Sequence, residues 1–263
     1  MFITSMEGAY SLNGKTAIIT GGNRGIGFGI ATAFAHQGAN IAILCRSEES
    51  AAKAIAELSE KYTGTFKFYK ADISDMESCK DAVAKAIADF KQIDVLVNNA
   101  GIGVVGNVLD MDDDLSSWFN CFNVDLHGAM RMSYLLGKHM REHKKGGRII
   151  NITSNAGAIV NIPNLMPAYS CSKAALNQLT KCLAYELAEF GVRVNAIAPG
   201  YTFSDLAANM PKERYAAMCE KIPAGRFGEA VEIGALATYL ASDSSDILTG
   251  AVITIDGGYS LAR

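Results

Sequence analysis

A glycine-rich turn between an apolar run and a helix-like segment constrains the fold of this chain more than any other feature. Residues 15–20 are rich in β-branched side chains and predict a buried strand. The run Gly21-Gly22-Asn23-Arg24-Gly25-Ile26-Gly27 follows at once, and apolar residues then recur at helical spacing as far as Phe34. Glycines in such a turn let the backbone approach a pyrophosphate, which binds at the helix N-terminus. The sequence therefore predicts the start of a dinucleotide-binding fold.

Short apolar runs and helical segments keep alternating along the rest of the chain. We predict strands at 15–20, 40–45, 66–71, 93–97, 148–152, 192–197 and 251–255. We predict helices at 51–61, 76–90, 115–143, 229–241 and from Tyr169 to Ala188, and a substrate loop or lid at 201–225, where prolines break helices. This order predicts an α/β fold, a Rossmann-type doubly wound parallel seven-stranded sheet with helices on both faces, and one domain over residues 1–263.

Composition excludes several classes of partner. The 24 basic and 27 acidic residues give a net charge of −3 without a basic tract, so neither nucleic acid nor a membrane is an expected partner. No apolar run approaches the length of a transmembrane helix, and no signal peptide is evident, so we expect a cytoplasmic protein. The six cysteines form no CxxC pair and are expected to be reduced. Only His139 and His143 share a helical face, and no metal site is expected.

Tyr169 and Lys173 lie four residues apart in a segment that opens an Ala/Leu-rich helix. Residues at this spacing stand on one helix face, so a phenol and an ammonium can share one pocket. A nearby cation stabilises the phenolate, and the pair is a candidate for proton transfer. Taken alone, the spacing also fits a solvated helix edge.

Two arginines indicate which dinucleotide the fold binds. The second predicted strand ends at Cys45 and Arg46, where the adenosine ribose of a bound dinucleotide lies, and Arg24 belongs to the glycine-rich turn. A carboxylate at this strand end binds a free 2′-hydroxyl, whereas an arginine accommodates a 2′-phosphate. Two cations without a carboxylate favour NADP(H), although Arg46 also fits an ordinary exposed arginine.

Seven short motifs, taken together and in this order, resemble the short-chain dehydrogenase/reductase family along essentially the whole chain. They are TGGNRGIG (20–27), NNAG (98–101), Asn123 within NVDLHG, Ser154, YSCSK (169–173), Pro199-Gly200 and IDGG (255–258). The resemblance implies that Tyr169 is the general acid/base and that Lys173 assists it and holds the nicotinamide ribose. It also implies that Ser154 polarises the substrate carbonyl and that Asn123 positions Lys173 through water.

The family resemblance also implies a set of cofactor contacts at the strand ends. These are expected at Gly21, Asn23, Arg24, Ile26, Gly27, Asp72, Ile73, Asn98, Ala100, Gly101, Pro199, Gly200 and Thr202, together with Arg46, Tyr169 and Lys173. The implied reaction is hydride transfer between nicotinamide C4 and a carbonyl carbon, with the protein supplying the proton and the geometry. Family members resembling this chain imply a homotetramer.

The spacing of Ser154 and Tyr169 departs from the family pattern. They are 15 positions apart where 13 is common, which leaves Thr153 as an alternative catalytic hydroxyl and lengthens the loop that borders the substrate. This loop, PGYTFSDL (199–206) and IPAGRFGE (222–229) resemble the NADP-dependent sorbose reductase and mannitol 2-dehydrogenase branch. The resemblance favours a small-molecule ketose such as fructose or sorbose, reduced to its polyol.

The expected pocket is bordered by residues 101–107, 157–167 and 201–210. Its polar side chains would be Asn155, Asn161, Asn164, Tyr201 and Ser204, and its apolar ones Ile159, Leu165, Met166 and Leu206. The alternatives are a 3-oxoacyl carrier-protein reductase, a gluconate 5-dehydrogenase, a hydroxysteroid dehydrogenase and a non-catalytic NADP-binding sensor. A carrier-protein reductase would need a basic docking patch, for which Arg131, Lys138 and Arg141 are candidates.

Overall fold

A parallel sheet of seven strands forms the centre of the molecule. The computed structural model describes residues 8–162, 165–203 and 210–262. The strands are β1 (Thr16–Thr20), β2 (Asn40–Cys45), β3 (Phe66–Lys70), β4 (Val95–Asn98), β5 (Gly147–Ile152), β6 (Val192–Pro199) and β7 (Val252–Ile255). Their order across the sheet is β3-β2-β1-β4-β5-β6-β7, and every neighbouring pair is parallel. The predicted doubly wound seven-stranded sheet is confirmed.

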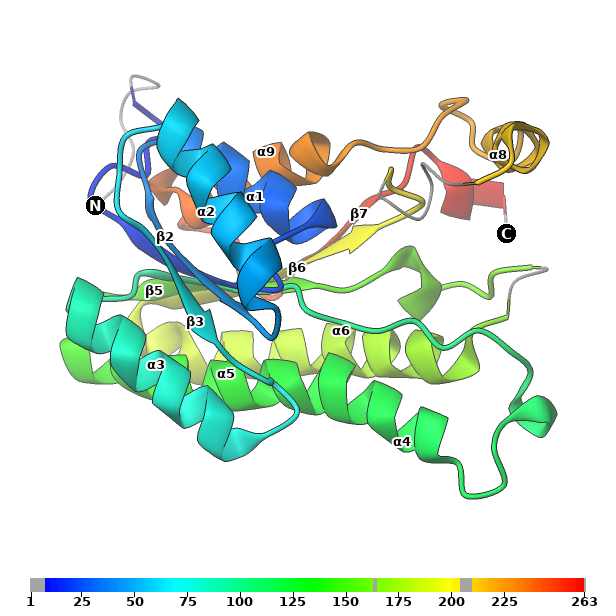
Figure 1. The fold of residues 1–263 in the computed structure, drawn as a ribbon, viewed down its shortest axis with the longest axis horizontal. Helices are drawn as coiled ribbons and strands as arrows, with labels where there is room; N and C mark the ends of the chain where they lie inside the picture. The colour runs from blue at the N-terminus through cyan, green and yellow to red at the C-terminus, as the bar shows by residue number, and fades with distance from the viewer. Residues whose placement is uncertain (1–7, 163–164, 204–209, 263) are drawn as a thin grey trace.

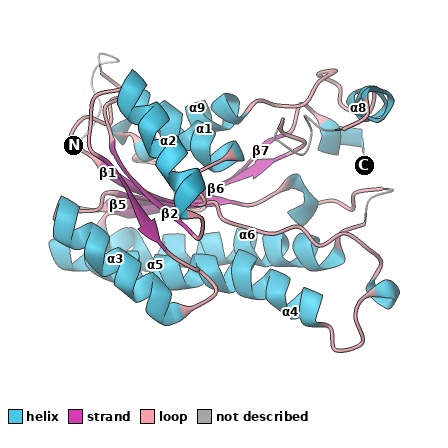
Figure 2. Ribbon diagram, in the orientation of Figure 1, coloured by secondary structure: helices cyan, strands magenta, loops and turns pink. Residues whose placement is uncertain are grey.

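Helices cover both faces of this sheet (Figures 1 and 2). On one face lie α1 (Gly25–His36), α2 (Glu48–Lys61) and α9 (Ala230–Ala241); on the other lie α3 (Met76–Phe90), α5 (Ala129–His143) and α6 (Pro167–Leu187). Two shorter helices, α4 (Ser116–Phe122) and α8 (Lys212–Cys219), lie beyond the carboxyl ends of the strands. Among the described residues, no helix is both long and apolar enough to cross a membrane.

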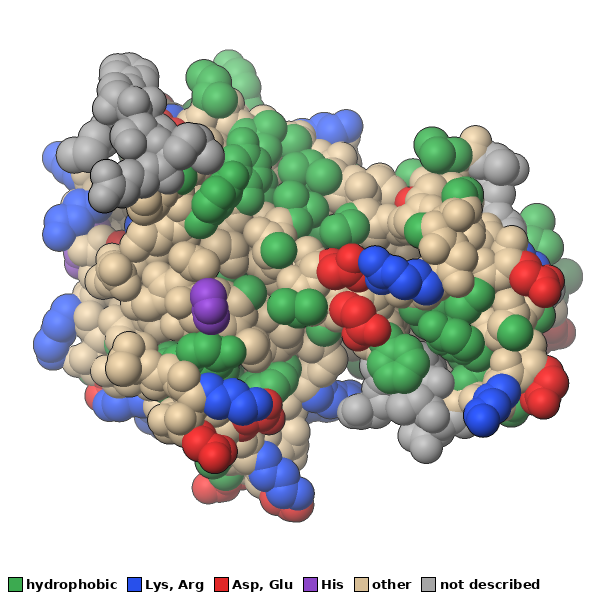
Figure 3. Space-filling model, turned by 90° about the horizontal axis from the view of Figure 1, so that it is seen from above, with side chains coloured by type: hydrophobic (Ala, Val, Ile, Leu, Met, Phe, Trp, Pro, Cys, Tyr) green, Lys and Arg blue, Asp and Glu red, His purple; other side chains and the backbone are tan. Residues whose placement is uncertain are grey.

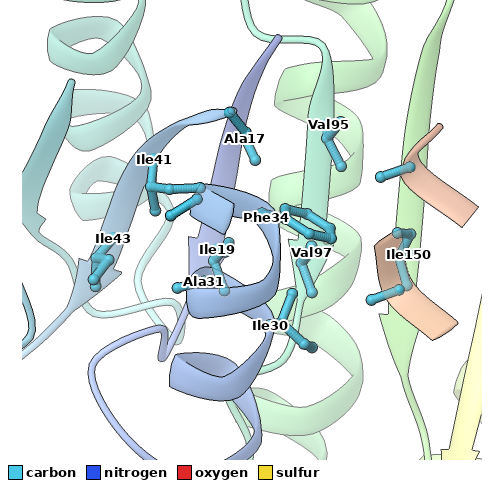
Figure 4. Packing of buried hydrophobic residues seen from close by; sticks show 14 of the residues in the cluster. Ala17, Ile19, Ile30, Ala31, Phe34, Ile41, Ile43, Val95, Val97 and Ile150 are labelled. Atoms are coloured by element: carbon cyan, nitrogen blue, oxygen red, sulfur yellow. The ribbon is translucent and has the colours of Figure 1, made fainter. Parts of the chain in front are cut away.

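Alternate residues of each strand enter two separate cores. Ala17 and Ile19 of β1 pack with Phe34 of α1, whereas Ile18 between them belongs to the core shared with α3 and α5. Figure 4 shows the first of these cores, in which α1 places Ile30, Ala31 and Phe34 against β1, β2 and β4. Because both faces are covered, the strands are apolar on both sides, as expected for a parallel sheet.

Three predicted elements differ from the structure. α2 begins three residues earlier than expected, because the Ser47 hydroxyl accepts a hydrogen bond from Ser50 N–H and caps the helix. The segment 201–225 contains α8, where we had expected a loop. The long helix expected over 115–143 is interrupted by a π-helical turn, Asn123–Gly128, between α4 and α5. This turn coincides with the weak helix propensity of Asn123 and Gly128.

Candidate active site

The predicted site residues gather at the carboxyl ends of the strands, around the point where the chain direction across the sheet reverses. β1 lies between β2 and β4, so the turn after β1 faces the segment after β4. The Thr20 hydroxyl accepts hydrogen bonds from the N–H groups of Asn99 (3.0 Å) and Ala100 (3.1 Å). A crevice at such a reversal is the usual ligand site of an open α/β sheet.

Asn99 braces the glycine-rich turn, a role that the sequence analysis did not assign. Its side-chain amide donates to the Thr20 carbonyl at 2.9 Å and to the Gly21 carbonyl at 3.2 Å. A Cβ on Gly27 would overlap both the Gly21 carbonyl and this amide, so the close approach of α1 to the turn requires glycine there. The turn is therefore rigid, and the N-terminus of α1 is directed at the crevice.

Arg24 and Arg46 carry the two cations beside this turn. Both are exposed, and neither side chain forms a hydrogen bond or an ion pair with any described residue. Asn23 reaches from the turn to α2, where its amide donates to the Ser50 hydroxyl at 2.8 Å. The arrangement leaves two unpaired guanidinium groups at the ends of β1 and β2, where a 2′-phosphate would need them.

The other predicted cofactor contacts lie at the ends of β3 and β6. The Asp72 carboxylate accepts hydrogen bonds from the Ser74 hydroxyl and N–H, which lower the pKa of Asp72 below its usual value. Ile73 is buried against the π-helical turn at Gly128. The end of β6 is fixed by Thr202, whose hydroxyl donates to the Gly200 carbonyl at 3.2 Å.

The Asn98 side chain points away from the crevice. It is buried between sheet and helices, where its amide donates to the Ser133 hydroxyl (2.9 Å) and to the Asn151 side-chain oxygen (2.8 Å). A cofactor contact at Asn98 would therefore have to use its backbone, whereas the side chain holds β4, β5 and α5 together.

Lys173 lies in the interior at the end of β5. Only 3 % of the residue is exposed, and its ammonium donates to the Ile152 carbonyl at 3.1 Å. The same ammonium lies 5.4 Å from the centre of the Tyr169 ring, one helical turn earlier on α6. The partly buried Tyr169 and the buried Lys173 thus share the helix face that the sequence predicted, and a solvated helix edge is excluded.

Ser154, not Thr153, has its hydroxyl proton available. The Thr153 hydroxyl donates to the Ile197 carbonyl of β6 at 3.1 Å, so its proton is used within the sheet. The Ser154 oxygen accepts a hydrogen bond from Ala156 N–H at 3.1 Å, which leaves its proton free to point at a ligand. The turn after Ser154 packs on α6, where a Cβ on Gly157 would lie 2.9 Å from the Lys173 carbonyl carbon.

The structure places Asp125, rather than Asn123, against Lys173. The Asn123 side chain turns toward α5, where its oxygen accepts a hydrogen bond from Arg131 at 2.8 Å and its amide lies 3.4 Å from the Ser74 carbonyl. The Asp125 carboxylate lies 3.4 Å from the Lys173 ammonium and also accepts a hydrogen bond from Ile102 N–H at 2.8 Å. Thus Asp125 contacts Lys173 directly, and the link through water that we predicted between Asn123 and Lys173 stays a prediction.

Burial dominates the electrostatics of this ion pair. The two side chains are 4 % and 0 % exposed. Burial raises the pKa of Asp125, although the Lys173 ammonium and the Ile102 N–H act to lower it. On the other side of the carboxylate, burial raises the pKa of the Cys121 thiol to about 11.

Gly101 lies directly over the ion pair. A Cβ at this position would be 3.3 Å from both Asp125 oxygens and 3.3 Å from the Lys173 nitrogen. Such a contact is tighter than most, so a methyl group would fit only if the pair shifted by a few tenths of an ångström. Asp125 and Lys173 therefore leave little room for a side chain at the glycine of the NNAG motif.

Loops from three parts of the chain border this site on its open side. The segment 101–107 is tied to the loop after β5 by a hydrogen bond from Gly106 N–H to the Leu165 carbonyl at 3.1 Å. Asn155 donates to the carboxylate of Asp256, in the turn after β7, at 3.2 Å. Three residues predicted to border the pocket, Asn164, Ser204 and Leu206, lie outside the described residues.

Comparison with known proteins places the chain in a family. A family model described as "Enoyl-(Acyl carrier protein) reductase" matches residues 21–260. A short-chain type dehydrogenase/reductase from Mycobacterium marinum superposes with a TM-score of 0.92 at 34% identity, covering 97% of this chain and 99% of that one. This chain belongs to the short-chain dehydrogenase/reductase family.

Several relatives of this chain have names that refer to sugars, sugar alcohols or sugar acids. Sorbose reductase of Candida albicans is 38% identical over 252 residues, which cover 95% of this chain and 89% of that protein. The NADP-dependent mannitol dehydrogenase of Alternaria alternata is 36% identical (97% and 96% covered). The 2-dehydro-3-deoxy-D-gluconate 5-dehydrogenase of Bacillus subtilis is 40% identical (97% and 98% covered). The resemblance to the sorbose reductase and mannitol dehydrogenase branch is confirmed.

Proposed function

We propose that the chain is an NADP(H)-dependent oxidoreductase that interconverts a polyhydroxylated ketone of sugar size and the corresponding secondary alcohol. The observation that carries the proposal is the buried ion pair of Lys173 and Asp125 with the partly buried Tyr169 near it, at the strand ends where Ser154 has a free hydroxyl proton. The relatives support the substrate class, since their names include a ketose, a hexitol and a keto-deoxygluconate.

The residues present fit a dinucleotide with a 2′-phosphate. The glycine-rich turn offers backbone N–H groups at the N-terminus of α1, and the Cβ-free space at Gly27 lets the turn close tightly. Arg24 and Arg46 would bind the 2′-phosphate, because they are unpaired cations at the ends of β1 and β2. When bound, the nicotinamide supplies the hydride.

The residues of the chain supply the proton and hold the carbonyl. Tyr169 would donate its phenolic proton to the carbonyl oxygen, and the Lys173 ammonium would stabilise the phenolate that remains. Ser154 would donate a hydrogen bond to the same oxygen, since its own oxygen is already occupied by Ala156 N–H. Asn123, whose side chain Arg131 and Ser74 hold in place, would position Lys173 through water.

The carrier-protein alternative loses its candidate docking patch. The Arg131 guanidinium donates to the Ile73 carbonyl and to Asn123, so it faces the interior. Lys138 lies over the Tyr134 ring and Arg141 over the Phe190 ring, both on the far part of α5 from the site. A sensor without catalysis would have no use for a buried Lys173 beside Tyr169.

A panel of carbonyl substrates with NADPH tests this function. We expect the highest kcat/KM among fructose, sorbose and 5-keto-gluconate, because a site with polar groups for sugar hydroxyls rejects analogues that lack them. An acetoacetyl thioester and a ketosteroid are the competing substrates. If either were preferred tenfold or more over every sugar, the proposed substrate class would be wrong.

We also propose that the active form is a homotetramer. Large apolar side chains remain exposed on the helices α4 to α6 and near the C-terminus, among them Phe119 (62 %), Tyr185 (90 %) and Ile247 (98 %). Contact with further copies of the chain would bury them, and closed symmetry is usual for such assemblies. Sedimentation equilibrium at micromolar concentration tests the assembly, and a stable monomer would contradict it.

A further inference from the structure

Helix α8 and the loop after β5 enclose a small cavity on the substrate side of the molecule. Its volume is about 170 Å³. Ile162 contributes from the loop between Ser154 and Tyr169, Tyr201 from the segment after β6, and Tyr259 from the C-terminus. Arg214, Met218 and Lys221 contribute from α8 and the turn that follows it. The cavity thus joins two of the three segments that border the predicted substrate site.

The walls of this cavity are held by aromatic packing. Tyr201 stacks on Phe227 with ring centres 5.3 Å apart and meets Tyr259 edge-on at 5.3 Å. Tyr215 of α8 packs on the same Phe227 ring at 4.8 Å. Because Tyr201 directly follows Gly200, this cluster ties α8 to the end of β6. Figure 3 shows the α8 region at the right, set off from the main body by a notch in the outline.

The charge of the cavity is what distinguishes it. Arg214 and Lys221 both line it and are exposed, and none of its described lining residues carries a carboxylate. Within the described part of the chain, neither cation forms an ion pair or a side-chain hydrogen bond, whereas the neighbouring Arg226 pairs with Glu232 at 2.7 Å. Two like charges at one small cavity create a positive potential that attracts an anion.

A larger cavity elsewhere in the molecule has a different charge pattern. It has a volume of about 800 Å³ and lies at the amino ends of the strands, on the opposite edge of the sheet from Lys173 and Ser154. Its described lining residues include six cations and four carboxylates, and ion pairs join Lys15 to Asp243 (2.6 Å) and Arg148 to Asp246 (3.3 Å). Carboxylates thus lie among the cations of the larger cavity, whereas no described carboxylate lines the cavity at α8.

We propose that Arg214 and Lys221 bind an anionic terminal group of the substrate, so that the preferred ketone is an acidic sugar derivative rather than a neutral ketose. This inference rests on the proposed function, because it places the anion in the same site. A cavity of this size holds a carboxylate with its adjoining carbons or one phosphate group, and both would accept charge-assisted hydrogen bonds from the two cations. The tyrosine and isoleucine walls would cover the carbon chain.

Three sugar ketones, which carry a carboxylate, a phosphate or no charge, test which anionic group the cavity binds. They are 5-keto-gluconate, fructose 6-phosphate and neutral fructose, each assayed with saturating NADPH. We expect one of the two anionic ketones to exceed fructose in kcat/KM by about tenfold or more, the size of one charge-assisted hydrogen bond. We also expect this preference to shrink as sodium chloride screens the two cations.

Substitution then assigns the preference to the two residues. In the double variant Arg214→Ala/Lys221→Ala, kcat/KM for the preferred anionic ketone should fall about tenfold or more, with fructose unchanged within about twofold. Lys212→Ala is the matched control, since Lys212 is an exposed cation on the same helix that does not line the cavity. Because all three positions are exposed, the fold should survive, and unchanged NADPH affinity would verify that.

The outcomes separate this inference from the proposed function. Fructose reduced as well as both anions, or a double variant that slows all three ketones equally, would overturn the inference and leave an NADPH-dependent ketose reductase. No turnover of any of the three would overturn both proposals.

Discussion

The ion pair between Asp125 and Lys173 should have a large coupling free energy. The carboxylate and the ammonium are 3.4 Å apart in side chains that are 0 % and 4 % exposed. Over that distance, the attraction of two unit charges is about 5 kcal/mol at an effective dielectric constant of about 20. When Lys173 is replaced, the Asp125 carboxylate can bind a proton and so avoid part of the free-energy cost of a buried, unpaired charge. We therefore expect a coupling free energy of about 3–4 kcal/mol at pH 7.

A double-mutant cycle measures this coupling without the cost of burying each charge. Asp125→Asn keeps the shape and the acceptor for Ile102 N–H, and Lys173→Met keeps the length of the side chain. Lys173→Met should lower the free energy of unfolding by several kcal/mol beside Asp125, but by much less beside asparagine. Urea unfolding of the apoproteins, followed by the fluorescence of Trp118, gives the four free energies. A single protein concentration must be used, because association adds to stability.

The raised pKa of Asp125 determines how this residue's contribution to the free energy of unfolding changes with pH. Its pKa is raised by burial, so the native state takes up a proton on this group at a higher pH than the unfolded chain does. A raised pKa means that the contribution of Asp125 to stability is greatest when it is protonated and falls as the pH rises through the native pKa. The coupling to Lys173 has the opposite trend, because it requires the ionised carboxylate. A coupling below about 1 kcal/mol at pH 8, or one that grows toward pH 5, would refute the buried ion pair.

Three further results are expected. Arg46→Asp should shift cofactor preference from NADPH toward NADH by roughly 10- to 150-fold in affinity, the value of a charge-assisted hydrogen bond; a wild-type protein that uses both cofactors equally would contradict the assignment. Tyr169→Phe should leave NADPH binding intact and slow turnover by about 10²–10⁴-fold, whereas near-normal turnover would exclude Tyr169 as the acid. Burial acts to raise the pKa of Asp256, but hydrogen bonds from Ser260 and Asn155 outweigh it and lower the pKa. Wild type should therefore be more stable than Asp256→Asn in urea at pH 7; the difference should begin to shrink near pH 4, the pKa of an unfolded aspartate, and vanish only below the lowered native pKa of Asp256.

Most of the fold could be predicted because its signals are local. The strands of a sheet covered on both faces are continuous apolar runs, so their number and order can be recognised in the sequence. The contact between Tyr169 and Lys173 also depends on one helix, in which residues four apart share a face. The predicted bounds of α3, residues 76–90, agree with the structure, where Asp75 caps the helix by accepting a hydrogen bond from Ser78 N–H.

The partner of Lys173 could not be predicted in the same way, because it depends on contacts between elements. Both Asn123 and Asp125 lie in the weak stretch NVDLHG, and the sequence does not show which of them faces α6. The π-helical turn decides this, because its extra residue rotates the register between α4 and α5 and places Asp125 inside. The π-helical turn therefore determines which residue contacts Lys173 directly, and the role through water that the family resemblance implies for Asn123 stays a prediction.

The contact between Asp125 and Lys173 nevertheless affects one residue that the sequence shows, Gly101. A turn can usually accept alanine where the backbone is ordinary, and the structure records no left-handed backbone at Gly101. The restriction on a side chain at this position comes instead from Asp125 and Lys173, whose charged atoms lie 3.3 Å from where a Cβ would be. Three segments far apart in the chain, after β4, between α4 and α5, and on α6, thus restrict one another at a single point. A glycine without a conformational reason therefore indicates that another group needs its space, and here that group is the ion pair beside Tyr169.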